Sequence, residues 1–190
     1  MDYALQSHFR LHAANTSFPK RLLTSTKGNR LKEPEETAVA FFNYAHSYAV
    51  SAVTLEDYPT EASHDDAPIS FLFYHAIELY LKSHLIVHGW QLEKLRKKSG
   101  HKICRPANEA ETNGLTIERE DREVFLMMFD PDNVITSRYI RVGHHRRLPR
   151  SAHFDTCKRL QGQIGLRAHR DSGVFRIPIL RDKRQITELS

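Results

Sequence analysis

The sequence feature that most constrains the fold is an almost unbroken apolar stretch near the middle of the chain, residues 68–89. A helix through these residues would be apolar on nearly every side, so other helices must cover most of its surface. The polar residues that interrupt the stretch would be costly in hydrocarbon; they are His75, Glu78, Lys82, His84 and His88. We therefore predict a buried central helix rather than a membrane span.

Three polar residues of this stretch form one stripe. His75, Glu78 and Lys82 follow a spacing of i, i+3 and i+7, which places them on the same helical face. One interpretation is a solvated face on which Glu78 and Lys82 make an ordinary ion pair. The other is a functional stripe that needs partners from elsewhere in the chain.

The remaining helices are predicted from apolar periodicity and from turn signals. A helix opened by Pro34 carries an apolar stripe that includes Phe41, Phe42, Tyr48 and Leu55. Further helices are expected over residues 90–98, 101–113, 116–129 and 151–168, and residues 134–142 fit either a strand or a helical turn. We expect Thr116 to be the N-cap of the helix over residues 116–129, and Glu118, Glu120, Asp121 and Glu123 to be solvated in its first turns.

These patterns predict an all-α fold, an antiparallel bundle of four to five helices with loosely ordered terminal extensions. The expected division is an N-terminal extension over residues 1–33, the bundle over residues 34–170 and a C-terminal tail over residues 171–190. A chain of 190 residues suits a single domain with extensions.

Charge and cysteine content limit the ligands and the cellular compartment that we expect. The formal net charge of +5 permits binding to a polyanion. Cys104 and Cys157 form neither a zinc-site spacing nor a disulfide framework, and no secretory pattern opens the chain, so we expect a reducing cytoplasm and buried thiols. His84 and His88 have a metal-ligand spacing without a third ligand, and we predict neither a metal nor a cofactor.

The densest positive segment lies between the last two predicted helices. It contains Arg138, Arg141, His144, His145, Arg146 and Arg147, followed by Arg150. Arginines can hold phosphates by paired hydrogen bonds, and a histidine can transfer protons at neutral pH. An arginine and a histidine on one phosphate could cleave RNA without a metal. A solvated basic loop is the alternative.

The order of three motifs resembles the HEPN (higher eukaryote and prokaryote nucleotide-binding) family. The motifs are Ala-Ile-Glu-Leu-Tyr-Leu-Lys over residues 76–82, Gly-His-Lys-Ile over residues 100–103, and Arg138-Tyr139. The chain departs from the family pattern at Lys102 and Ile140, where aspartate and proline are usual, and at Tyr139, where catalytic members carry a polar residue.

The resemblance implies a prokaryotic four- to five-helix bundle that forms a homodimer, in a toxin–antitoxin or phage-defence setting. It implies convergence of Glu78, Lys82, His101 and Arg138 near one end of the central helix. It also implies a catalytic pair, because five residues separate Arg138 from His144, and the spacing to His145 fits as well.

The sequence is compatible with three classes of function. The first is a module that binds RNA or a nucleotide through Glu78, Lys82 and His101, with Arg141, Arg146 and Arg147 as phosphate contacts. The alternative is a metal-independent endoribonuclease in which Arg138 holds the scissile phosphate and His144 or His145 moves protons. The third is a structural bundle that binds an antitoxin or another protein. Because Tyr139 departs from the catalytic motif of the family, we favour binding over catalysis.

Overall fold

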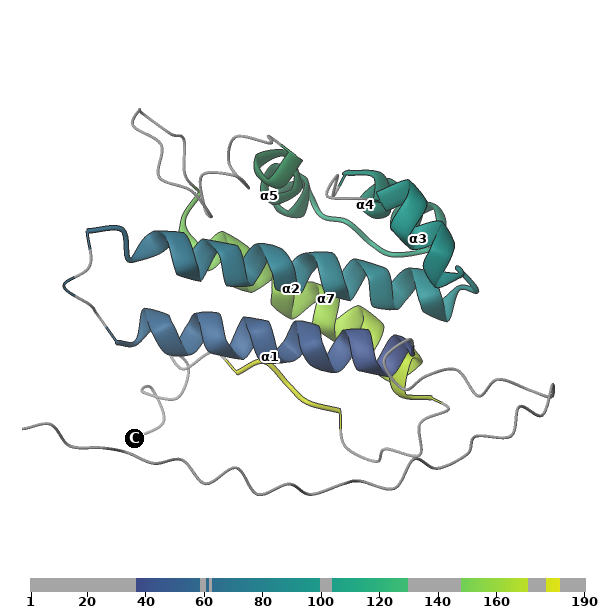
Figure 1. Cartoon of the computed structure of the whole chain (residues 1–190), viewed down its shortest axis with the longest axis horizontal. Coiled ribbons are helices and arrows are strands. Elements are labelled where there is room, and N and C mark those ends of the chain that lie inside the picture. The colour runs from purple at the N-terminus through teal and green to yellow at the C-terminus, as the bar shows by residue number, and fades with distance from the viewer. Residues whose placement is uncertain are drawn as a thin grey trace, which may run out of the picture. The chain divides into compact units, whose positions relative to one another are not determined.

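The computed structural model describes residues 37–58, 61, 63–99, 104–129, 148–170 and 177–181. Within these ranges the regular structure is helical, which confirms the all-α prediction for the described part of the chain (Figure 1). The helices are α1 Ala38–Glu56, α2 Asp66–Val87, α3 Leu92–Ser99, α4 Cys104–Thr112, α5 Arg119–Phe129 and α7 Arg150–His169. None of these helices is both long enough and apolar enough to cross a membrane.

Helix α2 is the centre of the bundle, as its apolar sequence predicts. It packs against α1, α7 and α4, and ten of its residues are buried. Helix α1 lies along one side of α2, while α3, α4 and α5 lie along the other (Figure 1). The buried side chains of α2 include Phe73, Ile77, Tyr80, Leu81 and Leu85.

Helices α1 and α2 are antiparallel. The Ser83 hydroxyl, late in α2, donates to the carbonyl of Ala38 at the start of α1 over 2.7 Å. Further along the pair, the rings of Tyr48 and His75 meet edge to face with centroids 4.4 Å apart. Three fully buried alanines on α1, Ala45, Ala49 and Ala52, leave little side-chain bulk between the two helices.

Helices α2 and α7 run in the same direction, so the prediction of a wholly antiparallel bundle is wrong. Arg150 at the start of α7 pairs with Asp65 and Asp66 at the start of α2, with 3.0 Å between its Nη2 and an Asp65 carboxylate oxygen. At the other end, Arg167 Nη1 lies 3.4 Å from His88 Nε2. Because α3, α4 and α5 intervene in the chain, α7 can enter the bundle at the same end as α2.

The ends of the helices follow local chemistry. Helix α1 begins at Ala38, later than the predicted Pro34, because the extended Thr37 caps it and accepts a hydrogen bond from the Ala40 amide at 3.1 Å. Helix α2 ends at a glycine, as predicted: Gly89 has a φ of 82°, and its amide donates to the Ile86 carbonyl.

The predicted inward stripe of α1 is too wide. Phe42 and the three alanines are fully buried, but Leu55 is 40% exposed and Tyr48 is half-buried. The reason is geometric: α1 contacts α2 and α7 through one side only, and the edge of the stripe that carries Phe41 and Tyr48 lies beside a groove.

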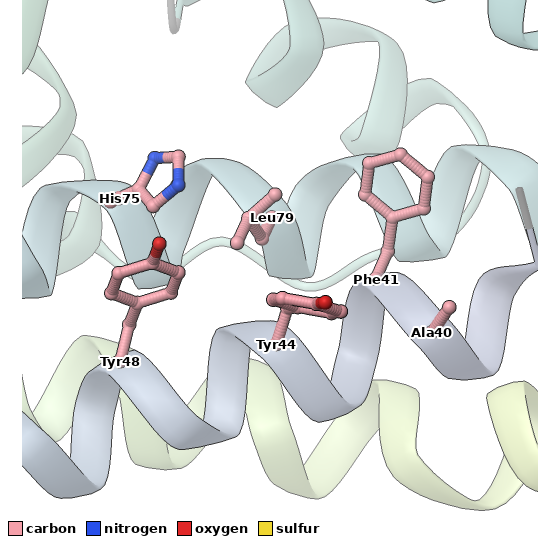
Figure 2. Close-up of a pocket in the computed structure, with 6 residues that line it drawn as sticks. All are labelled: Ala40, Phe41, Tyr44, Tyr48, His75 and Leu79. Carbon is pink, nitrogen blue, oxygen red and sulfur yellow. The ribbon is translucent and has the colours of Figure 1, made fainter. Parts of the chain in front are cut away.

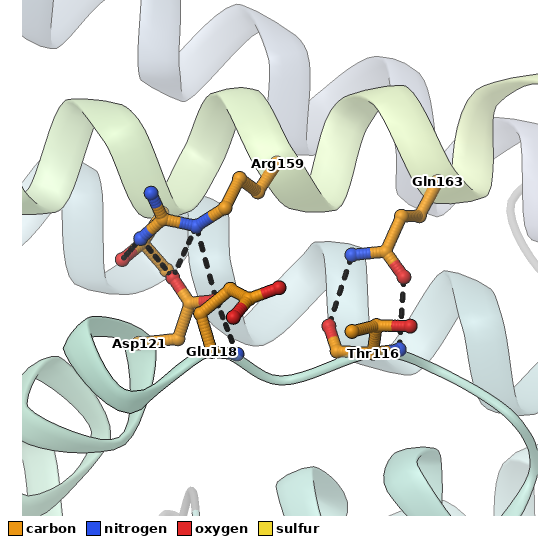
Figure 3. A network of polar contacts seen from close by, with 6 residues as sticks. Thr116, Glu118, Asp121, Arg159 and Gln163 are labelled. Atoms are coloured by element: carbon orange, nitrogen blue, oxygen red, sulfur yellow. Dashed lines mark hydrogen bonds and ion pairs between the residues drawn. The ribbon is translucent and has the colours of Figure 1, made fainter.

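A polar network joins α5 to α7 and corrects two sequence predictions (Figure 3). Thr116 is not an N-cap, because α5 begins at Arg119 and the backbone of Thr116 pairs with the side-chain amide of Gln163 at 2.8 and 2.9 Å. Asp121 is not solvated but 1% exposed. It accepts the amide of Glu118 at 3.1 Å, which is half of a capping box, and it is ion-paired with Arg159.

Part of the predicted loose tail is docked on the bundle. Residues 177–181 carry Leu180, which is 2% exposed, and the amide of Gln161 donates to the Pro178 carbonyl at 2.8 Å. Gly165 of α7 provides the room, since a methyl group there would lie 2.9 Å from Ile177.

Candidate functional site

The polar stripe of α2 is a half-buried ion pair with a histidine beside it. Lys82 Nζ lies 2.5 Å from Glu78 Oε1, and the two side chains are 21% and 18% exposed. His75 Nδ1 lies 3.9 Å from the other Glu78 oxygen. The predicted i,i+4 pair is therefore formed, but on a face that is only partly solvated. Lys82 and Glu78 neutralise each other, so neither presents an unbalanced charge to a ligand.

A groove lies next to this stripe, between α1 and α2 (Figure 2). It has a volume of about 240 Å³ and is lined by Ala40, Phe41, Tyr44, Tyr48, His75 and Leu79. Figure 2 shows the Tyr48 ring reaching toward His75 from the facing helix. On its other side, His75 stacks on Phe71 with centroids 6.0 Å apart.

Sequence reasoning missed the α1 side of this groove. Phe41, Tyr44 and Tyr48 recur at i, i+3 and i+7, a spacing that places all three on one face. Two of them were assigned to the core because a wide apolar stripe does not reveal where its edge meets solvent. Tyr44, 63% exposed, marks that edge.

Helix α3 carries an exposed basic face that sequence reasoning also left aside. Lys94, Arg96 and Lys97 are exposed, whereas Leu95 is 1% exposed and anchors the helix. The ammonium of Lys94 lies 3.7 Å from the centroid of the Trp90 ring. Among the described residues, no carboxylate pairs with these three cations. The missed signal was charge density, because residues 92–105 contain six Lys or Arg and one Glu.

Two of the histidines that are buried inside the bundle are held neutral. His153 is 3% exposed and lies against Phe73 and Tyr74. Burial lowers its pKa to about 4, against the opposing effect of the Pro149 carbonyl. His84 is 2% exposed, and burial, followed by the nearby His88, lowers its pKa to about 4.

The interface between α2 and α7 also buries two groups that can lose a proton, the Cys157 thiol and the Tyr80 hydroxyl. Cys157 is fully buried, which confirms its assignment as a core thiol, and burial raises its pKa. Burial likewise raises the pKa of Tyr80, whose hydroxyl has no hydrogen-bond partner among the described residues. Both groups stay protonated at neutral pH, so Cys157 is no nucleophile.

Most of the predicted site residues lie outside the described residues. These are His101, Arg138, Arg141, His144, His145, Arg146 and Arg147. Of the predicted set, Glu78 and Lys82 are described, and they contact each other. Arg150, which follows the basic segment, is engaged by Asp65 and Asp66. The rings of His84 and His88 lie 4.2 Å apart, and no group of three potential metal ligands occurs among the described residues.

Fold and site together define a class: an all-α protein whose central helix carries a half-buried Glu–Lys pair, with an aromatic groove on one side and a basic helix on the other. Comparison with protein-family models, curated proteins and solved structures finds no match for the chain.

Proposed function

We propose that this chain is a HEPN-like helical module that binds RNA. The observation that carries the proposal is the exposed basic face of α3, with Lys94, Arg96 and Lys97 free of carboxylate partners among the described residues. Such cations can each displace counterions from a phosphate backbone, which is the main source of sequence-independent affinity.

The sequence extends this basic surface. Helix α3 leads directly into the Gly-His-Lys-Ile motif, which contains His101, and then into Arg105. The second basic segment, with Arg138, Arg141, Arg146 and Arg147, ends just before α7. We propose that both segments contact the phosphates of one RNA.

The Glu78–Lys82 pair takes a supporting role in this proposal. Its charges cancel within α2, and its side chains are mostly covered. A half-buried pair of this kind fixes the side-chain arrangement on its helix more readily than it grips a phosphate. We therefore expect Lys82→Met to weaken RNA binding less than a charge reversal on α3.

The test is fluorescence anisotropy with a labelled single-stranded RNA and the full-length chain. Arg96→Glu should weaken binding by about tenfold or more at low salt, because it replaces an attraction to phosphate with a repulsion. Arg119→Glu on α5 is the matched control: it makes the same change at an exposed position (89%) on another helix. Equal affinities for both variants and the wild type would refute the α3 surface as an RNA site.

The endoribonuclease alternative can be tested in the same samples, after incubation with a chelator that removes metal ions. RNA that stays intact with the wild-type chain supports the binding module. RNA that is cleaved by the wild type and left intact by Arg138→Ala and His144→Ala supports catalysis instead. Competition by mononucleotides at low concentration would assign the surface to a nucleotide rather than to RNA.

A further inference from the structure

The groove between α1 and α2 is lined mainly by rings. Phe41, Tyr44 and Tyr48 come from one face of α1, and His75 comes from α2 (Figure 2). The rings of Tyr48 and His75 pack edge to face, with centroids 4.4 Å apart, which fixes both of them at one end of the groove. Tyr44, 63% exposed, marks the open edge. The groove therefore offers a ligand aromatic faces more than aliphatic surface.

The rings of α1 do not form a flat slot. In Figure 2 the Phe41 ring faces the viewer, whereas the neighbouring Tyr44 ring is seen edge-on. The planes of these two rings therefore cross. A flat ligand such as a nucleobase stacks best on rings that lie parallel to it. A compact, rounded group can instead touch several crossed faces at once.

The groove has no fixed charge of its own. Among the described residues, none that lines it is an Asp, Glu, Lys or Arg, and α1 has none from Ala38 to Leu55. The charged pair of the neighbouring stripe, Glu78 and Lys82, is closed on itself with 2.5 Å between Oε1 and Nζ. A strongly hydrated ion would lose its water in this groove without gaining a charged partner. A weakly hydrated cation would lose less and would be attracted by the negative faces of the rings.

We propose that the α1–α2 groove binds a small quaternary ammonium ion of the choline type. The methyl groups of such an ion fit against crossed aromatic faces, and its charge is attracted by any ring whose centroid lies within about 6 Å. A primary ammonium is more strongly hydrated and gains less on transfer into the groove. A neutral group of the same shape gains the apolar contact but not the attraction to the rings.

The size of the groove is consistent with this ligand. Its volume of about 240 Å³ equals that of roughly eight water molecules at about 30 Å³ each. It lies below the roughly 300 Å³ at which pockets for drug-sized ligands begin. Because the groove is open along Tyr44, we expect a dissociation constant on the order of 1 mM. The proposal is independent of RNA binding, since α3 lies on the opposite side of α2 from α1 (Figure 1).

The test is a titration of ligands with the full-length chain, measured by proton NMR of the ligand methyl groups in a buffer of about pH 8, at which a free imidazole is uncharged. Choline should bind at least about fivefold more tightly than its neutral isostere, in which a carbon atom replaces the ammonium nitrogen. Its methyl signals should shift upfield because they lie over ring faces. Ethanolamine, a primary ammonium, should bind more weakly than choline.

Two tyrosines of similar exposure provide matched variants. Tyr44→Leu should weaken choline binding by about two- to fivefold, because it removes one ring and keeps the apolar bulk. Tyr44→Phe keeps the ring and should bind choline like the wild type. Tyr58→Leu is the control, since Tyr58 is 67% exposed, lies beyond the end of α1 and does not line the groove. Circular dichroism confirms that each variant is folded.

Each result decides the matter. Equal affinities for choline and its neutral isostere would overturn the proposal, and so would equal losses in Tyr44→Leu and Tyr58→Leu. Adenosine that binds the groove more tightly than choline would assign it to a nucleobase instead. Weaker choline binding in Tyr44→Leu with unchanged RNA affinity would support the proposal even if the α3 surface failed its own test.

Discussion

Asp121 is a buried residue that helps to hold two helices of this protein together. It lies in the first turn of α5, where an acidic residue is favourable even in water. Here it is 1% exposed and serves two partners, the Glu118 amide and the Arg159 guanidinium. The same side chain therefore caps one helix and holds it to another.

Removing this carboxylate should destabilise the fold strongly. Asp121→Ala leaves Arg159 without its carboxylate partner and the Glu118 amide uncapped, so we expect a loss of about 3 kcal/mol in the free energy of unfolding. Glu123→Ala is the control: its pair with Arg119 spans 3.9 Å between exposed side chains, and such pairs contribute less than about 1 kcal/mol. Urea unfolding measures both. Similar losses in the two variants would contradict the role assigned to Asp121.

The buried His153 makes stability depend on pH. Its pKa is about 4 in the folded chain and 6.5 at its ordinary value. Between these values the unfolded chain binds a proton that the folded chain does not, so stability falls as the pH falls from 6.5 toward 4 and is unaffected above that window. The full loss is on the order of 3 kcal/mol.

His153→Leu should remove this part of the pH dependence. Unfolding free energies at neutral pH and at pH values near 5 should differ less in the variant than in the wild type, although His84 still contributes in the same direction. His64→Gln, at an exposed loop position, is the control and should keep the wild-type difference. An unchanged pH dependence in His153→Leu would show that the imidazole is not buried as described.

At the scale of the element, α7 is a helix with two different faces. Its inner face packs on α2, and Gly165 is the point where Phe42 and Ile177 approach its backbone. Gly162, less than one turn away, has open space around it. The two glycines therefore have different effects in the same helix. Gly165 makes room for its neighbours, whereas Gly162 only weakens the helix.

This difference gives a matched pair of substitutions. Gly165→Ala would place a methyl group 2.9 Å from Ile177 and 3.3 Å from Phe42, so it should destabilise the protein by about 1–3 kcal/mol. Gly162→Ala should stabilise it by about 0.5–1 kcal/mol, because alanine favours a helix and meets nothing there. Thermal unfolding by circular dichroism measures both changes. The same sign for both would contradict the packing at Gly165.

At the scale of the whole molecule, the two sides of α2 differ in charge. The exposed cations of α3 lie on one side of α2, and α1, which has no Asp, Glu, Lys or Arg from Ala38 to Leu55, lies on the other (Figure 1). The α3 side is therefore the side on which we propose that RNA binds.

Salt should weaken the proposed contact between α3 and RNA. RNA affinity should fall steeply and linearly on logarithmic axes as salt rises, because counterions are released on binding. Anisotropy titrations over one salt series measure this slope. An affinity that does not change with salt would contradict phosphate contacts by the α3 cations.

Much of the helical architecture could be predicted because it depends on local patterns. The central position of α2, the ion pair of Glu78 and Lys82, the glycine at its end and the buried Phe154, Cys157, Leu160 and Ile164 of α7 all follow from spacing along one helix. The Arg138–His145 segment stays a sequence prediction, since it lies outside the described residues.

Two kinds of feature could not be predicted from the sequence. Asp121 looked like an ordinary first-turn carboxylate, because its partner Arg159 is 38 residues away in the chain. Phe41 and Tyr48 looked like core residues, because periodicity gives a face but not the width that neighbours cover. In both cases the deciding contact is long-range.

The sequence by itself determined that the described part of the chain is helical, that α2 is central and that its polar residues form one stripe. Helical periodicity is a local property, and an all-round apolar helix has to be buried wherever it stands. Only the tertiary structure decided that α2 and α7 run in parallel, that Asp121 is buried and that a groove stays open between α1 and α2. These outcomes depend on which surfaces meet, and that choice is made by the packing of the whole bundle.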